Sequence, residues 1–96
     1  MHAVVRTYSG QGAKELLDVL DKNKTTIEQL IRGIRGFVSF SLVRTGDGGF
    51  TVSVFQDKTG SDESVRVARE WITKNAGTIG ASPPKVIEGS VILQVV

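Results

Sequence analysis

The sequence predicts an α+β fold in which an antiparallel sheet of four strands carries two helices on one face. Three observations support this prediction: stretches of alternating residues typical of strands, two longer stretches with apolar residues every three or four positions typical of helices, and glycine-rich breaks between them. In chain order the elements are strand, helix, strand, strand, helix, strand. This βαββαβ order is that of a ferredoxin-like plait. We expect residues 1–96 to form one such domain.

The N-terminal third of the chain is expected to hold a strand and a long helix. Residues His2–Tyr8 alternate loosely, which indicates a strand with both faces at least half buried. After a glycine-containing break, apolar residues spaced by threes, fours and sevens form one stripe on a helix that begins at Ala13. Residues 23–26 are a candidate bend, and Gly36 supplies the left-handed residue that ends the helix.

The middle of the chain is typical of a hairpin. Phe37–Arg44 and Phe50–Gln56 alternate as strands do, and the glycines of the connection Thr45–Gly49 accept the positive φ angles of a tight turn. The two strands are therefore expected to be antiparallel neighbours.

A second helix and a last strand complete the pattern. Thr59–Asp62 fits the Ser/Thr-x-x-acid start of a helix, which is expected to end at Gly77. Beyond the prolines at 83 and 84, residues 85–96 are expected to hold the last strand, with Ser90–Val96 its clearest part.

Two helices on one face leave the other face of the sheet open. On the hairpin, the more apolar set is expected to meet the helices: Val38, Phe40, Leu42, Phe50, Val52 and Val54. The open side would then carry Phe37, Ser39, Ser41, Val43, Thr51, Ser53 and Phe55. A contiguous uncharged surface of this kind usually marks an interaction site. We predict a homodimer through this sheet face, and the alternative is that the small hydroxyls simply face water.

A space lined by hydroxyl groups and aromatic rings is also a candidate site for a small molecule. Polar groups on the first strand could reach its mouth, and the tryptophan of the second helix is expected mainly to pack, with stacking on a ligand as the alternative. The candidate pocket residues are Arg6, Tyr8, Phe37, Ser39, Ser41, Thr51, Ser53, Phe55 and Trp71.

Composition argues against several other classes. The absence of cysteine excludes disulfides, thiolate metal sites and cysteine nucleophiles. Twelve basic and ten acidic residues are scattered along the chain, and Gly49–Val52 lacks the basic residue and second ring of an RNA-recognition motif, so no nucleic-acid partner is expected. No apolar run approaches the roughly 18–20 residues that span a bilayer, and no signal peptide is recognisable, so we expect a cytoplasmic protein without a membrane partner.

Two local features are candidate sites. Gly10–Lys14 lies between a strand and a helix, where a phosphate could bind, but Glu15 stands where a dinucleotide fingerprint needs glycine, and a flexible turn is favoured. The sole histidine, His2, is expected at the surface. We expect no cofactor and no metal.

Residues Gly36–Arg44, the hairpin, and Phe55-Gln56-Asp57-Lys58 opening a helix resemble the dimeric α+β barrel superfamily, and more narrowly the antibiotic biosynthesis monooxygenase-like domains. The resemblance covers the whole chain in element order. It implies two plaits that pair face to face. Members include cofactor-free oxygenases acting on aromatic polyketides or quinols, haem-degrading enzymes, and proteins of no known activity.

The resemblance leaves open whether the chain is an enzyme. Phe55 stands where the active members often carry tryptophan, the first strand has no asparagine, and the second helix lacks the histidine that ligates iron in the haem-degrading members. We therefore expect a homodimer that binds a small aromatic or amphipathic molecule, with monooxygenase-like catalysis undecided. The alternative is a non-enzymatic ligand-sensing or protein-interaction module with a filled pocket.

Overall fold

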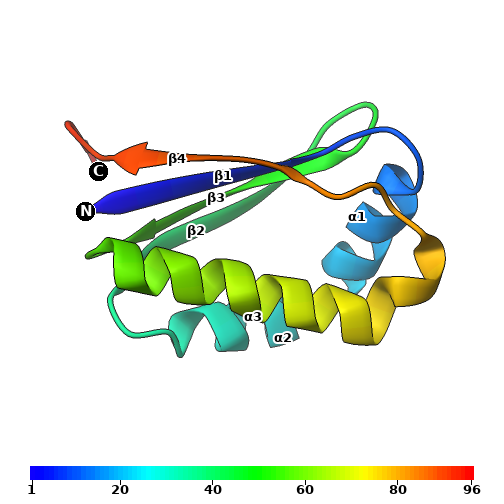
Figure 1. The fold of residues 1–96 in the computed structure, drawn as a ribbon, viewed down its shortest axis with the longest axis horizontal. Helices are drawn as coiled ribbons and strands as arrows, with labels where there is room; N and C mark the ends of the chain where they lie inside the picture. Colours follow the sequence, from blue (N-terminus) through cyan, green and yellow to red (C-terminus); the bar gives the residue numbers. More distant parts are fainter.

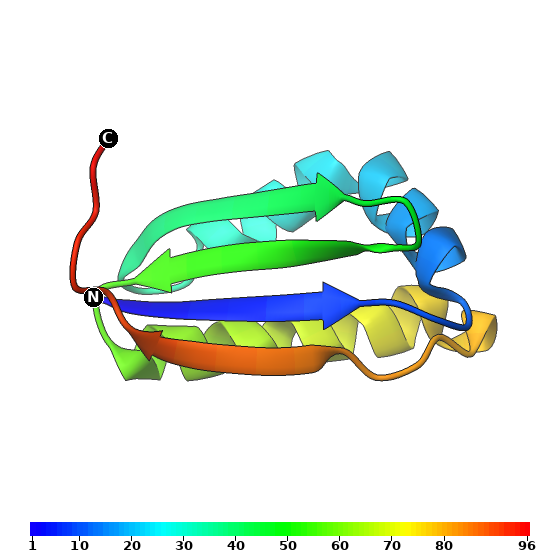
Figure 2. The same ribbon diagram turned by 90° about the horizontal axis from the view of Figure 1, so that it is seen from above.

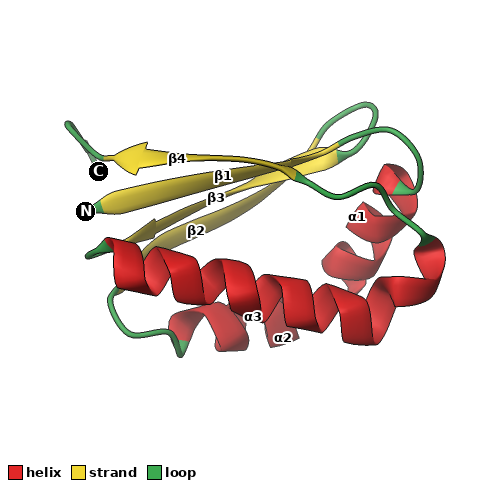
Figure 3. Cartoon of the chain, in the orientation of Figure 1, coloured by secondary structure: helices red, strands yellow, loops and turns green.

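The computed structural model describes residues 1–96, and it contains one four-stranded antiparallel sheet in the order β2-β3-β1-β4 (Figure 1). All helices lie on one face of this sheet (Figure 3). The elements are β1 (His2–Tyr8), α1 (Ala13–Lys22), α2 (Lys24–Arg32), β2 (Phe37–Arg44), β3 (Gly49–Phe55), α3 (Lys58–Ala76), a short 3₁₀ turn (Gly77–Ile79) and β4 (Lys85–Ser90). The predicted ferredoxin-like α+β fold is confirmed, and no helix combines the length and the apolar character needed to cross a bilayer.

The predicted long first helix is divided into two at Asn23. The Asn23 side chain donates to the carbonyl oxygen of Val19 over 2.7 Å, and its own carbonyl accepts from the amide of Ile27. Gly36 has the expected positive φ of 85°, but the regular helix ends at Arg32, earlier than predicted. The amide of Ile34 donates to Ile31 instead of continuing the helical ladder, which turns the buried Ile34 towards the sheet.

α3 ends at Ala76, next to the predicted Gly77, but it begins two residues earlier than the capping pattern from Thr59 predicted. Its N-cap is Asp57, whose carboxylate accepts a hydrogen bond from the amide of Gly60 at 3.2 Å. The helix runs beneath β1 and β4, whereas α1 and α2 lie towards the β2 edge (Figure 2). The space between α2 and α3, above the floor formed by the sheet, is where the candidate site lies.

The predicted faces of β3 are wrong by one residue. The turn consists of four residues, with the amide of Thr45 donating to the carbonyl of Gly48, and Gly49 belongs to the strand. As a result Leu42 pairs with Thr51, and Ser41 pairs with Val52. Because side chains alternate along a strand, a shift of one residue exchanges the two faces completely.

The corrected register moves four predicted residues to the helix side of the sheet. Phe37, Thr51, Ser53 and Phe55 face the helices, and a β-bulge follows Phe37. The open face keeps the predicted Ser39, Ser41 and Val43, which pair with Val54, Val52 and Phe50. This open face, which also carries Val5 and Ile87, is more apolar than the sequence predicted.

The last strand ends where the prediction placed its clearest part. β4 pairs with β1, and the pair His2–Ser90 is its last, because β1 starts at His2. Beyond it, the amide of Val91 still donates to the carbonyl of Met1 at 2.9 Å. Residues 91–96 then leave the sheet (Figure 2, red), so the prediction of a strand over 90–96 is wrong.

Candidate ligand-binding cleft

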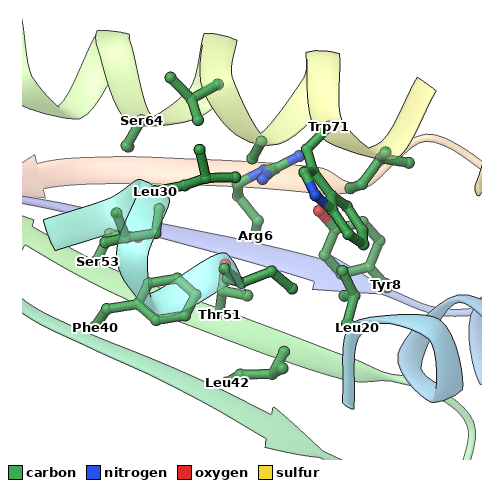
Figure 4. A pocket seen from close by; sticks show the side chains of 15 residues that line it. Arg6, Tyr8, Leu20, Leu30, Phe40, Leu42, Thr51, Ser53, Ser64 and Trp71 are labelled. Carbon is green, nitrogen blue, oxygen red and sulfur yellow. The ribbon is translucent and has the colours of Figure 1, made fainter. Parts of the chain in front are cut away.

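A cleft lies between the helix-facing side of the sheet and the helices (Figure 4). Its floor is formed by alternate residues of three strands, and its walls come from α1, α2 and α3. Eleven of its 15 lining residues are hydrophobic. The lining includes Arg6, Tyr8, Leu20, Leu30, Phe40, Leu42, Thr51, Ser53, Ser64 and Trp71.

The cleft is narrow as it stands. The cavity at its centre has a volume of about 40 Å³. Since one water needs roughly 10–15 Å³ of such space, a few water molecules fit. A larger occupant requires side chains at the rim to move. Leu30, which is 39% exposed, and the partly exposed Trp71 are free enough to do so.

Local sequence explains why two large polar side chains fit beneath the helices. On β1 the residues that face the helices are Val4, Arg6 and Tyr8, and the last two pair on β3 with Thr51 and Gly49. A Cβ at Gly49 would lie 2.7 Å from the Leu17 side chain and would overlap the Val43 carbonyl oxygen. Gly49 therefore lets Leu17 of α1 pack directly onto β3, next to the strand that carries Arg6 and Tyr8.

Arg6 is the unusual residue of the cleft. It is only 7% exposed, its Nε is buried, and no protein group accepts a hydrogen bond from that atom. Its guanidinium lies over the ring of Tyr8, with the Arg6 Cζ 5.4 Å from the ring centroid. Burial lowers the pKa of Arg6 from its ordinary value, Tyr8 partly opposes this, and the positive charge of Arg69 lowers it further. Arginine nevertheless stays protonated in proteins, so the cleft holds a buried positive charge.

The other polar side chains of the cleft have free hydrogen-bonding capacity as well. None of the side-chain hydrogen bonds within the protein involves the side chains of Tyr8, Thr51, Ser53 or Trp71. Ser64 is different, because its hydroxyl donates to the Ser61 carbonyl at 2.6 Å. Burial raises the pKa of the Tyr8 phenol, although Arg6 partly opposes the shift, so Tyr8 is a neutral donor near pH 7.

The structure brings part of the predicted site together. Arg6, Tyr8, Thr51, Ser53 and Trp71 line the cleft. The others lie elsewhere. Phe55 is fully buried against α2. Phe37 packs edge-on against it, with 6.0 Å between the ring centroids, and borders a separate groove. Ser39 and Ser41 lie on the open face.

Sequence reasoning did not identify Ser64 or Leu30 as cleft residues. Ser64 precedes Trp71 by seven positions on α3, a spacing that places both on one helix face. That spacing could have identified it. The sole histidine, His2, bonds Glu88 at 2.8 Å and does not line the cleft, which also contains no Asp or Glu.

Replacing Arg6 with methionine is expected to stabilise the protein in the absence of ligand. A buried charge without a hydrogen-bonded partner is unfavourable, so its removal should raise the free energy of unfolding by about 1–3 kcal/mol. Urea denaturation of both proteins measures the difference. The matched control is Arg44→Met, because Arg44 pairs at the surface with Asp18 and Asp21. Lower stability of Arg6→Met would contradict the prediction.

Comparison with solved protein structures supports the fold described above. No protein-family model matches the chain, and no curated protein does. Several solved structures do match it. A Nitrosomonas europaea protein of unknown function is 17% identical with a TM-score of 0.73, covering 99% of this chain and 91% of its own. A Streptomyces coelicolor monooxygenase in complex with nanaomycin D is 15% identical with a TM-score of 0.64, covering 99% and 89%.

A third structure, a dimeric ferredoxin-like protein from an uncultured marine organism, is 12% identical with a TM-score of 0.64, covering 99% of this chain and 95% of its own. At these identities the likeness defines the fold. The chain has the ferredoxin-like α+β fold of these structures, and the resemblance stated from the hairpin is confirmed at the level of the fold.

Proposed function

We propose that this protein is a homodimer that binds a small aromatic or amphipathic molecule in the cleft between the sheet and the helices. The observation that carries the proposal is the gathering of unpartnered polar groups from Arg6, Tyr8, Thr51 and Ser53 within an otherwise apolar lining. Ligand sites typically combine apolar walls with a few convergent polar groups. The complex of the Streptomyces coelicolor monooxygenase with nanaomycin D, on the same fold, supports this choice.

The homodimer is supported by the open face of the sheet. Val5, Phe50, Val52 and Ile87 lie on this face, on the side opposite the helices. An apolar surface of this kind on a soluble domain favours an interface. A second copy presents the same surface, and such a twofold arrangement is the commonest form of oligomer.

The narrowness of the cleft supports one alternative, a non-enzymatic sensing or interaction module whose cleft is filled by its own side chains. In that case the dimer surface would be the functional element. Monooxygenase-like catalysis on a bound molecule is a further step that the binding proposal does not require, because the cleft offers no histidine or carboxylate as a base.

A panel of quinols and polyketide-like phenols tests the binding proposal. Ligands are expected to raise the melting temperature and to change the fluorescence of Trp71, the only tryptophan. Ser53→Leu, which fills the cleft from its floor, should abolish both effects, whereas Ser9→Leu on an exposed loop should not. If no compound produces either effect, binding of quinols and phenols is ruled out and the filled-cleft alternative is favoured. Oxygen consumption in the same samples tests catalysis.

A further inference from the structure

We infer that the occupant of the cleft is an organic anion, an apolar molecule whose carboxylate or similar acidic group pairs with the guanidinium of Arg6. This inference rests on the proposed binding function and adds the charge of the ligand. It starts from a charge that the protein itself leaves without a counterion.

No acidic side chain of the chain is placed to neutralise Arg6. None of the ion pairs of the protein includes it. Arg6 borders two clefts, one between the sheet and α2–α3 and a second between α3 and the loop before β4, and neither is lined by Asp or Glu. Arginine is seldom buried unless it is paired. The missing negative charge must therefore come from outside the chain.

A second positive charge strengthens the argument. Arg69 of α3 lines the second cleft together with Arg6, and it takes part in no ion pair either. Arg69 is exposed, so water screens much of its charge, but its repulsion still adds to the cost of burying Arg6. An anion bound beside Arg6 would relieve that repulsion as well as the cost of burial.

The groups around Arg6 suit the recognition of an acid. In Figure 4 the guanidinium reaches from β1 to the side of Trp71, above Thr51 and Ser53 on the floor. The hydroxyls of Tyr8, Thr51 and Ser53 can all donate to an anionic oxygen. A guanidinium is planar and donates in a fork that matches a carboxylate, which a lysine ammonium does not do. The apolar part of the ligand would then lie along Phe40 and Leu42 of β2.

Two fluorescent probes with a common skeleton test the inference. Anilinonaphthalene sulfonate is an apolar anion, and N-phenylnaphthylamine is the same skeleton without the acid. Ser53→Leu, which fills the cleft from its floor, distinguishes a probe in the cleft, whose binding it should abolish, from one on the open face, whose binding it should leave unchanged. The wild type should bind the anionic probe at least about tenfold more tightly than the neutral one, as expected for hydrogen bonds to a charged group.

Variants at Arg6 identify the group responsible. Arg6→Met should weaken binding of the anionic probe by about tenfold to a hundredfold and should change the affinity for the neutral probe by no more than about twofold. Arg6→Lys should weaken it less, because the charge remains but the fork is lost. Arg44→Met, a surface control, should change neither probe.

The outcomes separate the inference from the function on which it rests. If both probes bind in the wild-type cleft with equal affinity, the ligand is not selected for its charge. The same holds if Arg6→Met binds both probes as tightly as the wild type does. Either result overturns the inference of an anionic ligand and leaves the binding function standing. If neither probe binds, or if Ser53→Leu leaves the binding of both probes unchanged, the binding function fails and the anion fails with it. The preference of the wild type for the anion is a test by itself, so the inference stays falsifiable even where an Arg6 variant does not fold.

Discussion

A lysine in place of Val52 is expected to convert a dimer of this protein into a monomer without unfolding it. Val52 lies in the middle of the open face, paired with Val5 on one side and with Ser41 on the other. In a twofold pairing of sheets this position lies near the partner's copy of the same face. The variant would thus bring like charges close together in a surface that is otherwise apolar.

The magnitudes favour this outcome. Burying four open-face side chains such as Val5, Phe50, Val52 and Ile87 contributes at most roughly 6–12 kcal/mol per chain, or about 12–24 kcal/mol for the pair. Association costs about 4–15 kcal/mol, so most of this range favours the proposed dimer. An unpaired buried ammonium costs several kcal/mol. Since each 1.4 kcal/mol is about tenfold, a loss of about 4 kcal/mol weakens the dimer roughly a thousandfold.

Sedimentation velocity at micromolar concentration measures the change in mass, and circular dichroism verifies that the variant is folded. Gln29→Lys makes the same change of charge on an exposed position of α2 and should remain a dimer. A wild-type protein that sediments as a monomer would remove the premise of the experiment and the homodimer proposal together.

Most of the fold could be predicted from the sequence because it depends on local patterns. The order of elements follows from apolar periodicity and from glycines, both of which are visible along the chain. The register of the hairpin does not follow from them. Either Gly48 or Gly49 could end the turn, and Gly49 joins the strand because it lies under Leu17 of α1, a contact between distant residues.

The placement of Gly49 in the strand also decides which part of the site could be predicted from the sequence. Moving Thr51 and Ser53 from the open face to the helix side places them beside Arg6 and Tyr8. The sequence indicates that Arg6 lies on a half-buried strand. It does not indicate that the charge lacks a partner, because acidic residues are frequent on α1 and α3 and only the packing shows that none reaches the cleft.

Phe55→Ala is expected to destabilise the protein by about 3–5 kcal/mol without removing the binding site. The sequence placed Phe55 among the pocket residues, whereas the structure buries it completely in a cluster with Ile31 and Ile34, outside the lining of the cleft. Loss of the ring leaves a cavity that the packed side chains around it can fill only in part. For a small domain with a total stability of about 5–15 kcal/mol, this is a large share.

Denaturant unfolding measures the loss, and the N-phenylnaphthylamine probe measures binding by the molecules that remain folded. Phe50→Ala is the matched control, because it removes the same ring from the open face of β3, where Phe50 is only partly buried. Its destabilisation should be clearly smaller at concentrations where both variants are compared as monomers. If Phe55→Ala instead weakens the probe more than about tenfold while leaving stability unchanged, Phe55 contacts the ligand. The cleft would then extend past Phe40 to the α2 end of the sheet.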